Sequence, residues 1–303
     1  MHFIFAPLVF SNLEGRANET SIAQKCYPFH GCCAIHPVME SRLKNKWVLI
    51  TGASSGFGAA AAKLFGAEGS KLLLGARRVD RLKQVADEAV KAGAPEAHVH
   101  ALDVTKTSSV EEFVKWSRER IGGKKPAEAK LDVLINNAGG ALGLDTVAEG
   151  KDDDWEAMMQ TNVLGVLRMT RAALPLMVNN PGGSIINVGS HASRWVYEGG
   201  SAYCGAKAAE LQITRVLRLE LNGTGLRVCT VDPGLAETEF SLVRFKGDSA
   251  KAKKPYEGTE PLVGQDIGEI IVWVASRPPH VNIDELIVKP TDQAAFHKVF
   301  RRK

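Results

Sequence analysis

The chain has 303 residues, of which 45% are hydrophobic and 24% charged, and its formal net charge is +4. A chain of this length and composition buries a large core without disulfides or metals, which argues against a disordered, fibrous or disulfide-stapled protein. The small charge is scattered along the sequence and gives no reason to expect a nucleic-acid partner. No apolar stretch is long enough to span a bilayer, so no membrane partner is expected either.

The N-terminal segment 1–43 shows neither helical nor strand periodicity. We expect it to be a poorly ordered extension of a single domain that occupies residues 44–303. Two histidines and two cysteines lie between residues 30 and 36, but their spacing matches no zinc pattern, so no metal site is expected. The opening apolar stretch lacks the basic residues of a signal peptide, and five irregularly spaced cysteines favour a reducing compartment. The sequence therefore predicts a cytoplasmic protein.

From residue 46 onward, short apolar runs alternate with amphipathic stretches. The runs predict strands at Trp47–Ile50, Leu72–Gly75, His98–Leu102, Val133–Ile135, Ser184–Val188, Leu226–Val231 and Glu285–Val288. The stretches between them predict helices, among them Arg81–Ala92, Ser109–Ile121, Trp155–Val178 and Ala206–Asn222. Alternation of this kind is typical of a doubly wound α/β fold, here with a mainly parallel seven-stranded sheet and helices on both faces. Ligands of such sheets bind beyond the carboxyl ends of the strands.

The turn after the first predicted strand carries three glycines. Gly52, Gly56 and Gly58 permit a tight turn, close approach to a phosphate and packing of helix on strand. Ser54 and Phe57 belong to the same turn, and the helix that follows presents free N–H groups to a pyrophosphate. An isolated glycine cluster is often an ordinary turn, but at a strand-to-helix junction it predicts a dinucleotide site.

The second predicted strand is followed by Arg77 and Arg78. A protein that binds NAD usually has an acidic residue here, which hydrogen-bonds the ribose 2′-hydroxyl. Two guanidinium groups suit a 2′-phosphate instead, because arginine offers planar, charged donors to phosphate oxygens. The alternative is a solvent-exposed helix start, although positive charge at that position opposes the helix dipole. We therefore predict NADP as the cofactor.

Further cofactor contacts are expected after the third and fourth predicted strands. Asp103, followed by Val104, can accept a hydrogen bond from an adenine amino group. Asn137, Ala138 and Gly139 are small enough to let a cofactor approach closely. Each of these signals is weak alone, and their order after successive strands is what favours a cofactor cleft.

Ser190 follows the fifth predicted strand, and Tyr203 and Lys207 stand four residues apart on the next helix. Residues i and i+4 share a helix face, so the Lys207 ammonium can reach the region of the Tyr203 hydroxyl. A nearby cation favours phenolate over phenol, which suits a tyrosine to proton transfer. Ser190 can donate to a substrate oxygen and stabilise a developing alkoxide. Taken alone, the same residues also fit a core tyrosine with polar neighbours.

The motifs Thr51–Gly58 and Asn136–Gly139, with the serine, tyrosine and lysine just described, resemble the short-chain dehydrogenase/reductase family. The resemblance extends from about residue 44 to the C-terminus. It implies a Rossmann-like sheet and hydride transfer between a nicotinamide and a carbonyl or alcohol. It also implies that Tyr203 is the acid/base, that Ser190 orients the carbonyl, and that Lys207 holds the nicotinamide ribose.

The same resemblance implies roles for four more residues. Asn162 matches the family's helix asparagine, which supports a water-mediated proton relay. Pro233 and Gly234 match the loop near the nicotinamide carboxamide, and Thr238 matches a cofactor contact.

Three segments resemble a narrower group, the NADP-dependent 3-hydroxy acid dehydrogenases: Asn136–Gly143, Gly234–Gly247 and Pro290–Ala294. This resemblance implies oxidation of serine, allo-threonine or related 3-hydroxy acids, and a homotetramer. Gly140 and the run Ser190–Arg194 depart from the pattern of that group, which leaves the preferred substrate open.

A small hydroxy acid needs a second anchor besides the reacting oxygen. Arg244 and Lys246 lie in the segment that covers the substrate in this fold, and Arg194 follows the fifth strand. Arg244 is the first candidate, because a planar guanidinium matches a carboxylate in two-pronged fashion. The competing interpretation is that these cations face solvent or pair with Glu237 and Glu239.

Two other functions remain open at this point. The first is a broad NADPH-dependent carbonyl reductase that acts on ketones or quinones without needing a carboxylate. The second is a non-catalytic NADP-binding regulator, because fold alone does not establish catalysis. The complete serine, tyrosine and lysine set favours an enzyme whose partner is a small-molecule hydroxy acid or carbonyl substrate.

Overall fold

The structure is a computed structural model that describes residues 41–178 and 180–302. Most of the predicted extension, including its histidines and cysteines, lies outside these residues. Its last three residues do not: Leu43 is only 2% exposed and packs in the core. Residues 41–43 therefore pack with the folded unit that the sequence analysis began at residue 44.

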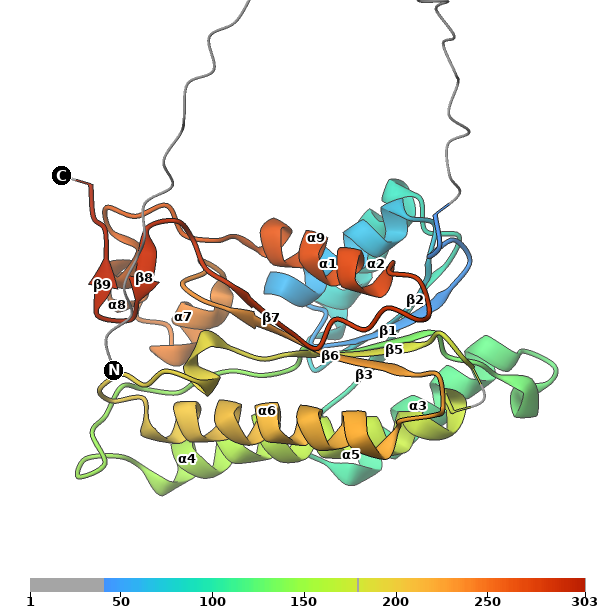
Figure 1. The fold of residues 1–303 in the computed structure, drawn as a ribbon, viewed down its shortest axis with the longest axis horizontal. Coiled ribbons are helices and arrows are strands. Elements are labelled where there is room, and N and C mark those ends of the chain that lie inside the picture. Colours follow the sequence, from blue (N-terminus) through green and yellow to red (C-terminus); the bar gives the residue numbers. More distant parts are fainter. Residues whose placement is uncertain (1–40, 179, 303) are drawn as a thin grey trace, which may run out of the picture. The chain divides into compact units, whose positions relative to one another are not determined.

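Seven strands form one parallel sheet, as predicted (Figure 1). Its spatial order is β3-β2-β1-β4-β5-β6-β7, and each neighbouring pair is parallel. The strands are β1 (Trp47–Thr51), β2 (Lys71–Ala76), β3 (Ala97–Ala101), β4 (Val133–Asn136), β5 (Ser184–Val188), β6 (Arg227–Pro233) and β7 (Glu285–Val288). The direction of winding reverses between β1 and β4, which is where a ligand is expected to bind.

Helices cover both faces of the sheet (Figure 1). One layer consists of α1 (Gly56–Ala67), α2 (Val79–Ala92) and α9 (Gly264–Ala275), and the other contains α3 (Thr107–Gly122), α4 (Asp152–Met159), α5 (Gly165–Ala173) and α6 (Ser201–Glu220). Successive strand residues point to opposite faces, so Val48 and Ile50 join one core cluster and Leu49 joins the other. This burial on both sides explains why the strands are almost continuously apolar.

The predicted helix over Trp155–Val178 is divided in the structure. A π-helical turn, Gln160–Leu164, separates α4 from α5, and a short 3₁₀ turn ends the segment at Leu174–Leu176. π-Helical turns are frequent at functional sites, and this one carries Asn162. Helix α6 also differs from its prediction, because it begins at Ser201 rather than Ala206 and so includes Tyr203 in its first turn.

Short elements follow β6 and β7 on the carboxyl-end side of the sheet. Helices α7 (Glu239–Arg244) and α8 (Ser249–Lys253) come from the segment after β6, and β8 (Gln293–Ala295) pairs with β9 (Lys298–Val299) in an antiparallel hairpin. In the ranges that the structure covers, no helix combines the length and hydropathy needed to cross a membrane.

Candidate active site

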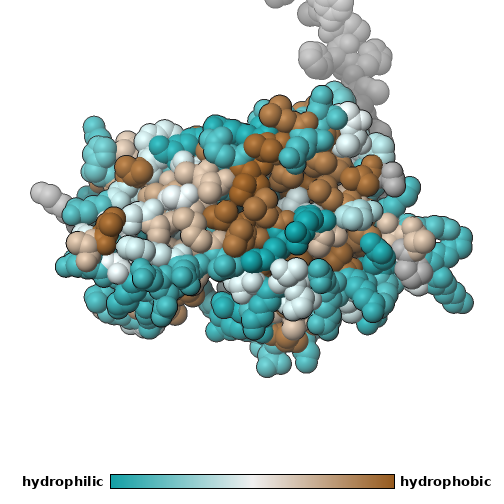
Figure 2. All heavy atoms as spheres, turned by 90° about the horizontal axis from the view of Figure 1, so that it is seen from below, coloured by the Kyte–Doolittle hydropathy of each residue, from teal (hydrophilic) through white to brown (hydrophobic). Residues whose placement is uncertain are grey.

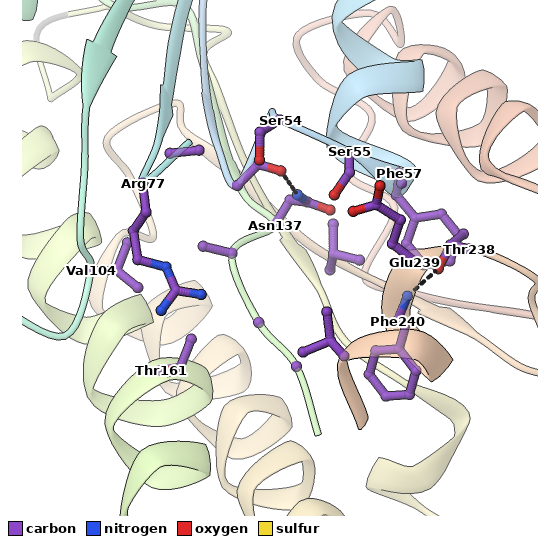
Figure 3. Close-up of a pocket in the computed structure, with 18 of the residues that line it drawn as sticks. Ser54, Ser55, Phe57, Arg77, Val104, Asn137, Thr161, Thr238, Glu239 and Phe240 are labelled. Carbon is purple, nitrogen blue, oxygen red and sulfur yellow. Dashed lines mark hydrogen bonds between the residues drawn. The ribbon is translucent and has the colours of Figure 1, made fainter. Parts of the chain in front are cut away.

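A cavity of about 330 Å³ opens at the carboxyl ends of the central strands. It gathers most of the residues that the sequence assigned to a cofactor, although they come from the loops after β1, β2, β3, β4 and β6 and from helix α6. They are Gly52, Ser54, Gly56, Phe57, Arg77, Arg78, Asp103, Val104, Asn137, Ala138, Gly139, Tyr203, Lys207 and Thr238. Figure 3 shows Arg77, Val104 and Thr161 on one side of the cavity and Ser55, Glu239 and Phe240 on the other.

The glycine turn after β1 fits tightly against the loop after β4. Gly52 has a φ of +66°, and a Cβ added there would lie 2.8 Å from the Cα of Ala138. Gly58 does not line the cavity, but a Cβ at that position would lie 2.5 Å from Nδ2 of Asn137. Both positions therefore need glycine, and the backbone around them is left open to a ligand.

Hydrogen bonds hold these two loops together. The Thr51 hydroxyl accepts from the backbone N–H groups of Asn137 and Ala138 at 3.0 and 2.9 Å. The Asn137 amide in turn donates to the Thr51 carbonyl oxygen at 2.9 Å. The ends of β1 and β4 are thus fixed at the position where the order of the strands reverses.

The two predicted phosphate-binding arginines differ in their surroundings. Arg77 lies at the edge of the cavity and is exposed. Arg78 donates to the Ser55 hydroxyl at 2.7 Å and pairs with Glu239 at 2.9 Å. Glu239 also pairs with Arg81. Burial alone would raise the pKa of Glu239, but the hydrogen bonds from both arginines lower it below its usual value.

A second cavity, of about 320 Å³, adjoins the first. Both cavities are lined by Phe57, Gly189, Tyr203, Thr238 and Phe240, so they form one continuous cleft. The second cavity adds Ser190, Pro233, Gly234 and Arg244, all of which the sequence assigned to the site. The cleft thus has one part that fits a dinucleotide and another that fits a substrate, with Tyr203 at their junction.

Ser190 and Lys207 are both fixed by the chain around them. The Ser190 hydroxyl oxygen accepts from the Ala192 N–H at 3.1 Å, so its own hydrogen is available to another acceptor. The Lys207 ammonium donates to the Val188 carbonyl oxygen at 2.9 Å. Ser190, Tyr203 and Lys207 are each buried, which limits the access of water to this end of the cleft.

Asn162 is anchored from two sides. Its carbonyl oxygen accepts from the Gly140 N–H at 3.1 Å, and its amide donates to the Gly140 and Met158 carbonyl oxygens at 2.9 and 2.8 Å. A Cβ at Gly139 would lie 2.7 Å from Asn162 Oδ1 and 3.6 Å from Lys207 Nζ. The loop after β4 therefore passes between Asn162 and Lys207, and the π-helical turn sets its path.

Glu210 is a site residue that the sequence analysis missed. It is only 1% exposed, and its Oε2 accepts from the Lys207 ammonium at 2.7 Å. Burial raises the pKa of Glu210 to about 7, and the Lys207 cation opposes that rise. The sequence did contain a signal for this residue. Glu210 follows Tyr203 by seven positions and Lys207 by three, and residues at these spacings share one helix face.

Of the three predicted substrate cations, Arg244 lines the second cavity. Its Nε donates to the Gly143 carbonyl oxygen at 2.9 Å, and one of its terminal nitrogens donates to the Tyr197 hydroxyl at 2.7 Å. The guanidinium carbon lies 5.7 Å from the centre of the Tyr203 ring. A cation is thus held at a fixed place close to the tyrosine.

The other two cations are paired elsewhere. Arg194 binds the carboxylates of Asp232 and Glu285, so it is directed into an ion-pair network behind the site. Lys246 pairs with Asp154 at 2.8 Å. The structure thus argues against Arg194 as an anchor. The competing interpretation paired these cations with Glu237 and Glu239. Glu239 instead forms ion pairs with Arg78 and Arg81.

The C-terminal hairpin forms a wall of the second cavity. Phe296, at the turn between β8 and β9, packs against His191 and Tyr197 in tilted arrangements, with ring centres 4.6 and 4.8 Å apart. Gln293 accepts from the Leu235 N–H at 2.7 Å. Burial lowers the pKa of His191 to about 4, with smaller contributions from two neighbouring cations, so its ring is neutral at neutral pH.

Within the two described ranges, no cluster of histidine, cysteine, aspartate and glutamate side chains is arranged to hold a metal ion. At the junction of its two cavities the cleft brings together Ser190, Tyr203 and Lys207. A dinucleotide cavity that leads to these three residues defines a class of hydride-transfer enzymes.

The family model of the short chain dehydrogenases matches residues 46–247, and the chain belongs to this family. The Rossmann-like fold and the oxidoreductase class predicted from the sequence are confirmed.

The similarity extends to individual members of the family. The chain is 41% identical over 249 residues to the NADP-dependent 3-hydroxy acid dehydrogenase YdfG of Escherichia coli, covering 82% of this chain and 96% of that one. It is 42% identical over 265 residues to the NADP-dependent 3-hydroxy acid dehydrogenase of Schizosaccharomyces pombe, covering 87% and 99%. Among solved structures, the closed form of a serine dehydrogenase complexed with NADP⁺ superimposes with a TM-score of 0.76 at 39% identity, covering 85% and 100%.

Proposed function

We propose that this protein is an NADP-dependent dehydrogenase of small 3-hydroxy acids such as serine or allo-threonine. The names of its relatives support the cofactor and the substrate class. The observation that carries the proposal is the position of Arg244, whose guanidinium lies 5.7 Å from the Tyr203 ring in the cavity that also contains Ser190.

The residues present suit NADP. The glycine turn leaves backbone N–H groups at the start of α1 for the pyrophosphate. Arg77 lies at the edge of the same cavity, where it can bind a 2′-phosphate. When bound in this cavity, NADP⁺ would supply the acceptor for the hydride from C3 of the alcohol. The cofactor contacts proposed here are those of the first cavity together with Pro233 and Gly234 of the second.

The side chains of this chain would handle the proton and the oxygen. Tyr203 removes the hydroxyl proton as the hydride leaves C3, and the C3–O bond becomes a carbonyl. Ser190 donates its free hydrogen to that oxygen and stabilises the negative charge that develops on it. Lys207 stabilises the phenolate and holds the ribose, while Asn162 fixes the loop that passes Lys207.

Arg244 would bind the substrate carboxylate. Two of its hydrogen bonds go to Gly143 and Tyr197, and they fix the guanidinium in place before a substrate arrives. A group held in advance loses less conformational entropy on binding. The carboxylate and the reacting hydroxyl would then both be fixed, which is the orientation that hydride transfer requires.

A broad carbonyl reductase is the second candidate. The walls of the second cavity are rich in aromatic rings, among them Tyr197, Phe240, Phe245 and Phe296, and they suit a larger apolar ketone. A purely regulatory NADP-binding role is disfavoured, because the serine, tyrosine and lysine are complete and lie in one cleft.

One assay distinguishes these functions. The purified protein is incubated with NADP and with L-serine, L-allo-threonine, 3-hydroxypropanoate or their methyl esters, and NADPH absorbance is followed. We expect the acids to be oxidised with the higher kcat/KM. Preference for the esters, or for uncharged ketones in the reverse direction, would support the broad reductase, and absence of turnover with all of them would support the regulator.

We also propose a homotetramer. Figure 2 views the molecule from the side of α4, α5 and α6, and hydrophobic residues gather in the middle of that face. Exposed hydrophobic residues of these helices and of the π-helical turn between α4 and α5 are Met159, Leu164, Leu167, Val216 and Leu219. Leu219 is 78% exposed. A large contiguous patch of exposed apolar residues is unusual on the surface of a monomer. Light scattering on the wild type and on Leu219→Glu tests whether this face joins subunits, because the variant should have a lower mass.

Two proposals concern the remaining organisation of the chain. Residues 41–303 would form the catalytic domain, and a chain shortened to them should keep its melting temperature. The protein would act in the cytoplasm, which the free, buried Cys204 and Cys229 support. Fractionation of cells that express the full chain tests the location.

A further inference from the structure

We propose that Glu210 is a positioning residue that holds the Lys207 ammonium in place and weakens the effect of its positive charge on Tyr203. This inference rests on the roles proposed above for Tyr203 and Lys207. It assigns a function to a buried carboxylate that does not itself touch substrate or cofactor.

The geometry supports a holding role. Tyr203, Lys207 and Glu210 lie along one face of α6. Within the described chain, the Lys207 ammonium donates to Val188 O at 2.9 Å and to Glu210 Oε2 at 2.7 Å. These bonds engage two of its three N–H groups and leave one for the ribose and the phenolate. The direction of that third group is therefore set by Val188 and Glu210 together.

The charges around the pair make Glu210 the counterion of Lys207. Besides Lys207 and Tyr203 on α6, the charged group that faces the pair is Asp232 of β6. Asp232 is itself bound by Arg194, which also binds Glu285 of β7. The adjacent strand β5 contributes the Val188 carbonyl and has no titratable side chain. The negative charge of Asp232 is thus neutralised by Arg194. The positive charge of Lys207 is neutralised by Glu210.

Balancing Lys207 has a consequence for Tyr203. A cation close to a phenol favours the phenolate, and an anion bound to that cation reduces the effect. The interaction is strong here because Lys207 and Glu210 are both buried. Since the pKa of Glu210 is raised to about 7, its charge changes in the range where many enzymes work. Where Glu210 is ionised, it would therefore raise the pH at which Tyr203 becomes a competent base.

The test is Glu210→Gln, which keeps the length and one hydrogen-bond acceptor but removes the charge. The matched control is Glu220→Gln, an exposed glutamate near the end of the same helix. For each protein, kcat/KM for alcohol oxidation is measured across pH with whichever alcohol the wild type oxidises. We expect the midpoint of the profile to move to lower pH by about one unit in Glu210→Gln, and to stay at the wild-type value in Glu220→Gln.

An unchanged or higher midpoint in Glu210→Gln would overturn the inference, even if the rate itself fell, because a purely structural role lowers rate without moving the midpoint downward. A second readout does not need turnover. The phenolate absorbance of Tyr203 is obtained as the difference between proteins with and without Tyr203→Phe, in both the wild-type and Glu210→Gln backgrounds.

The phenolate should form at lower pH in the Glu210→Gln background. If no alcohol is oxidised by the wild type, the proposed function fails, while this titration still decides the role of Glu210. Equal phenolate titrations in the two backgrounds would contradict that role whatever the substrate turns out to be.

Discussion

The Glu239 carboxylate lies 2.9 Å from the Arg78 guanidinium, although 161 positions separate the two residues in the chain. The pair joins the start of α7 to the start of α2 across the mouth of the cofactor cavity. A 2′-phosphate that reaches Arg78 must compete with this carboxylate. A bound 2′-phosphate and the segment at the start of α7 would thus share one arginine.

Glu239→Gln should bind NADP more tightly than the wild type. The substitution removes a negative charge that repels the phosphate and releases Arg78 from its ion pair. Because the pair is partly exposed, we expect a modest effect, a KM for NADP lower by about two- to fivefold. The KM for NAD, which has no 2′-phosphate, is the internal control, and an equal change for both cofactors would contradict the explanation.

Arg77→Ala should have the opposite effect on cofactor choice. A charge-assisted hydrogen bond to phosphate is worth about 1.5–3 kcal/mol, so kcat/KM with NADP should fall by about ten- to a hundredfold. The kcat/KM with NAD should change much less, because NAD has no 2′-phosphate. Lys83→Ala, which removes an exposed cation from helix α2 just after Arg77, serves as the control. If the wild type used both cofactors equally well, the assignment of Arg77 would be wrong.

Tyr203→Phe should abolish turnover and leave NADPH binding nearly intact. The ring stays in the cleft, but the proton that the reaction must move is lost. General acid–base catalysis contributes about 10²–10⁴-fold, and we expect a fall in kcat of that size. NADPH fluorescence measures the binding, and retention of most of the wild-type kcat would show that another group transfers the proton.

Arg244→Leu should remove the preference for hydroxy acids over their methyl esters. The variant loses the cation held by Gly143 and Tyr197 but keeps an apolar side chain of moderate size. We expect KM for the acids to rise by about tenfold or more, while the values for the esters stay close to wild type. Lys246→Leu is the matched control, because Lys246 pairs with Asp154. Equal losses in both variants would indicate long-range steering of the substrate instead of direct contact.

His191 should make the protein sensitive to acid. Its pKa falls from 6.5 to about 4 on folding, so the unfolded chain takes up a proton first as the pH drops. The stabilising contribution of the neutral ring is complete above pH 6.5 and is lost as the pH falls toward 4. Linkage gives a loss of about 2 kcal/mol between about pH 7.5 and about pH 5. Urea unfolding at both pH values measures the free energy of unfolding of the wild type and of His191→Gln. The variant should lose less stability than the wild type as the pH falls.

The sequence by itself determined the sheet and the positions of the candidate catalytic residues. Apolar runs with flanking amphipathic stretches are local patterns, so β5 and β7 were predicted at the residues where they occur. Parallel strands bring their carboxyl ends to one edge, which is why residues after six different strands could be assigned to one cleft. The four-residue spacing of Tyr203 and Lys207 is likewise a local property of a helix.

Only the tertiary structure decided which charged groups meet. Arg194 was a reasonable candidate anchor from its place after β5, but it binds Asp232 and Glu285, which lie on strands far along the chain. The position of Glu239 beside Arg78 likewise depends on how the segment after β6 folds back over the cofactor cavity. Local sequence patterns carry no information on such pairs, because an ion pair depends on distance in space and the packing of distant elements sets that distance.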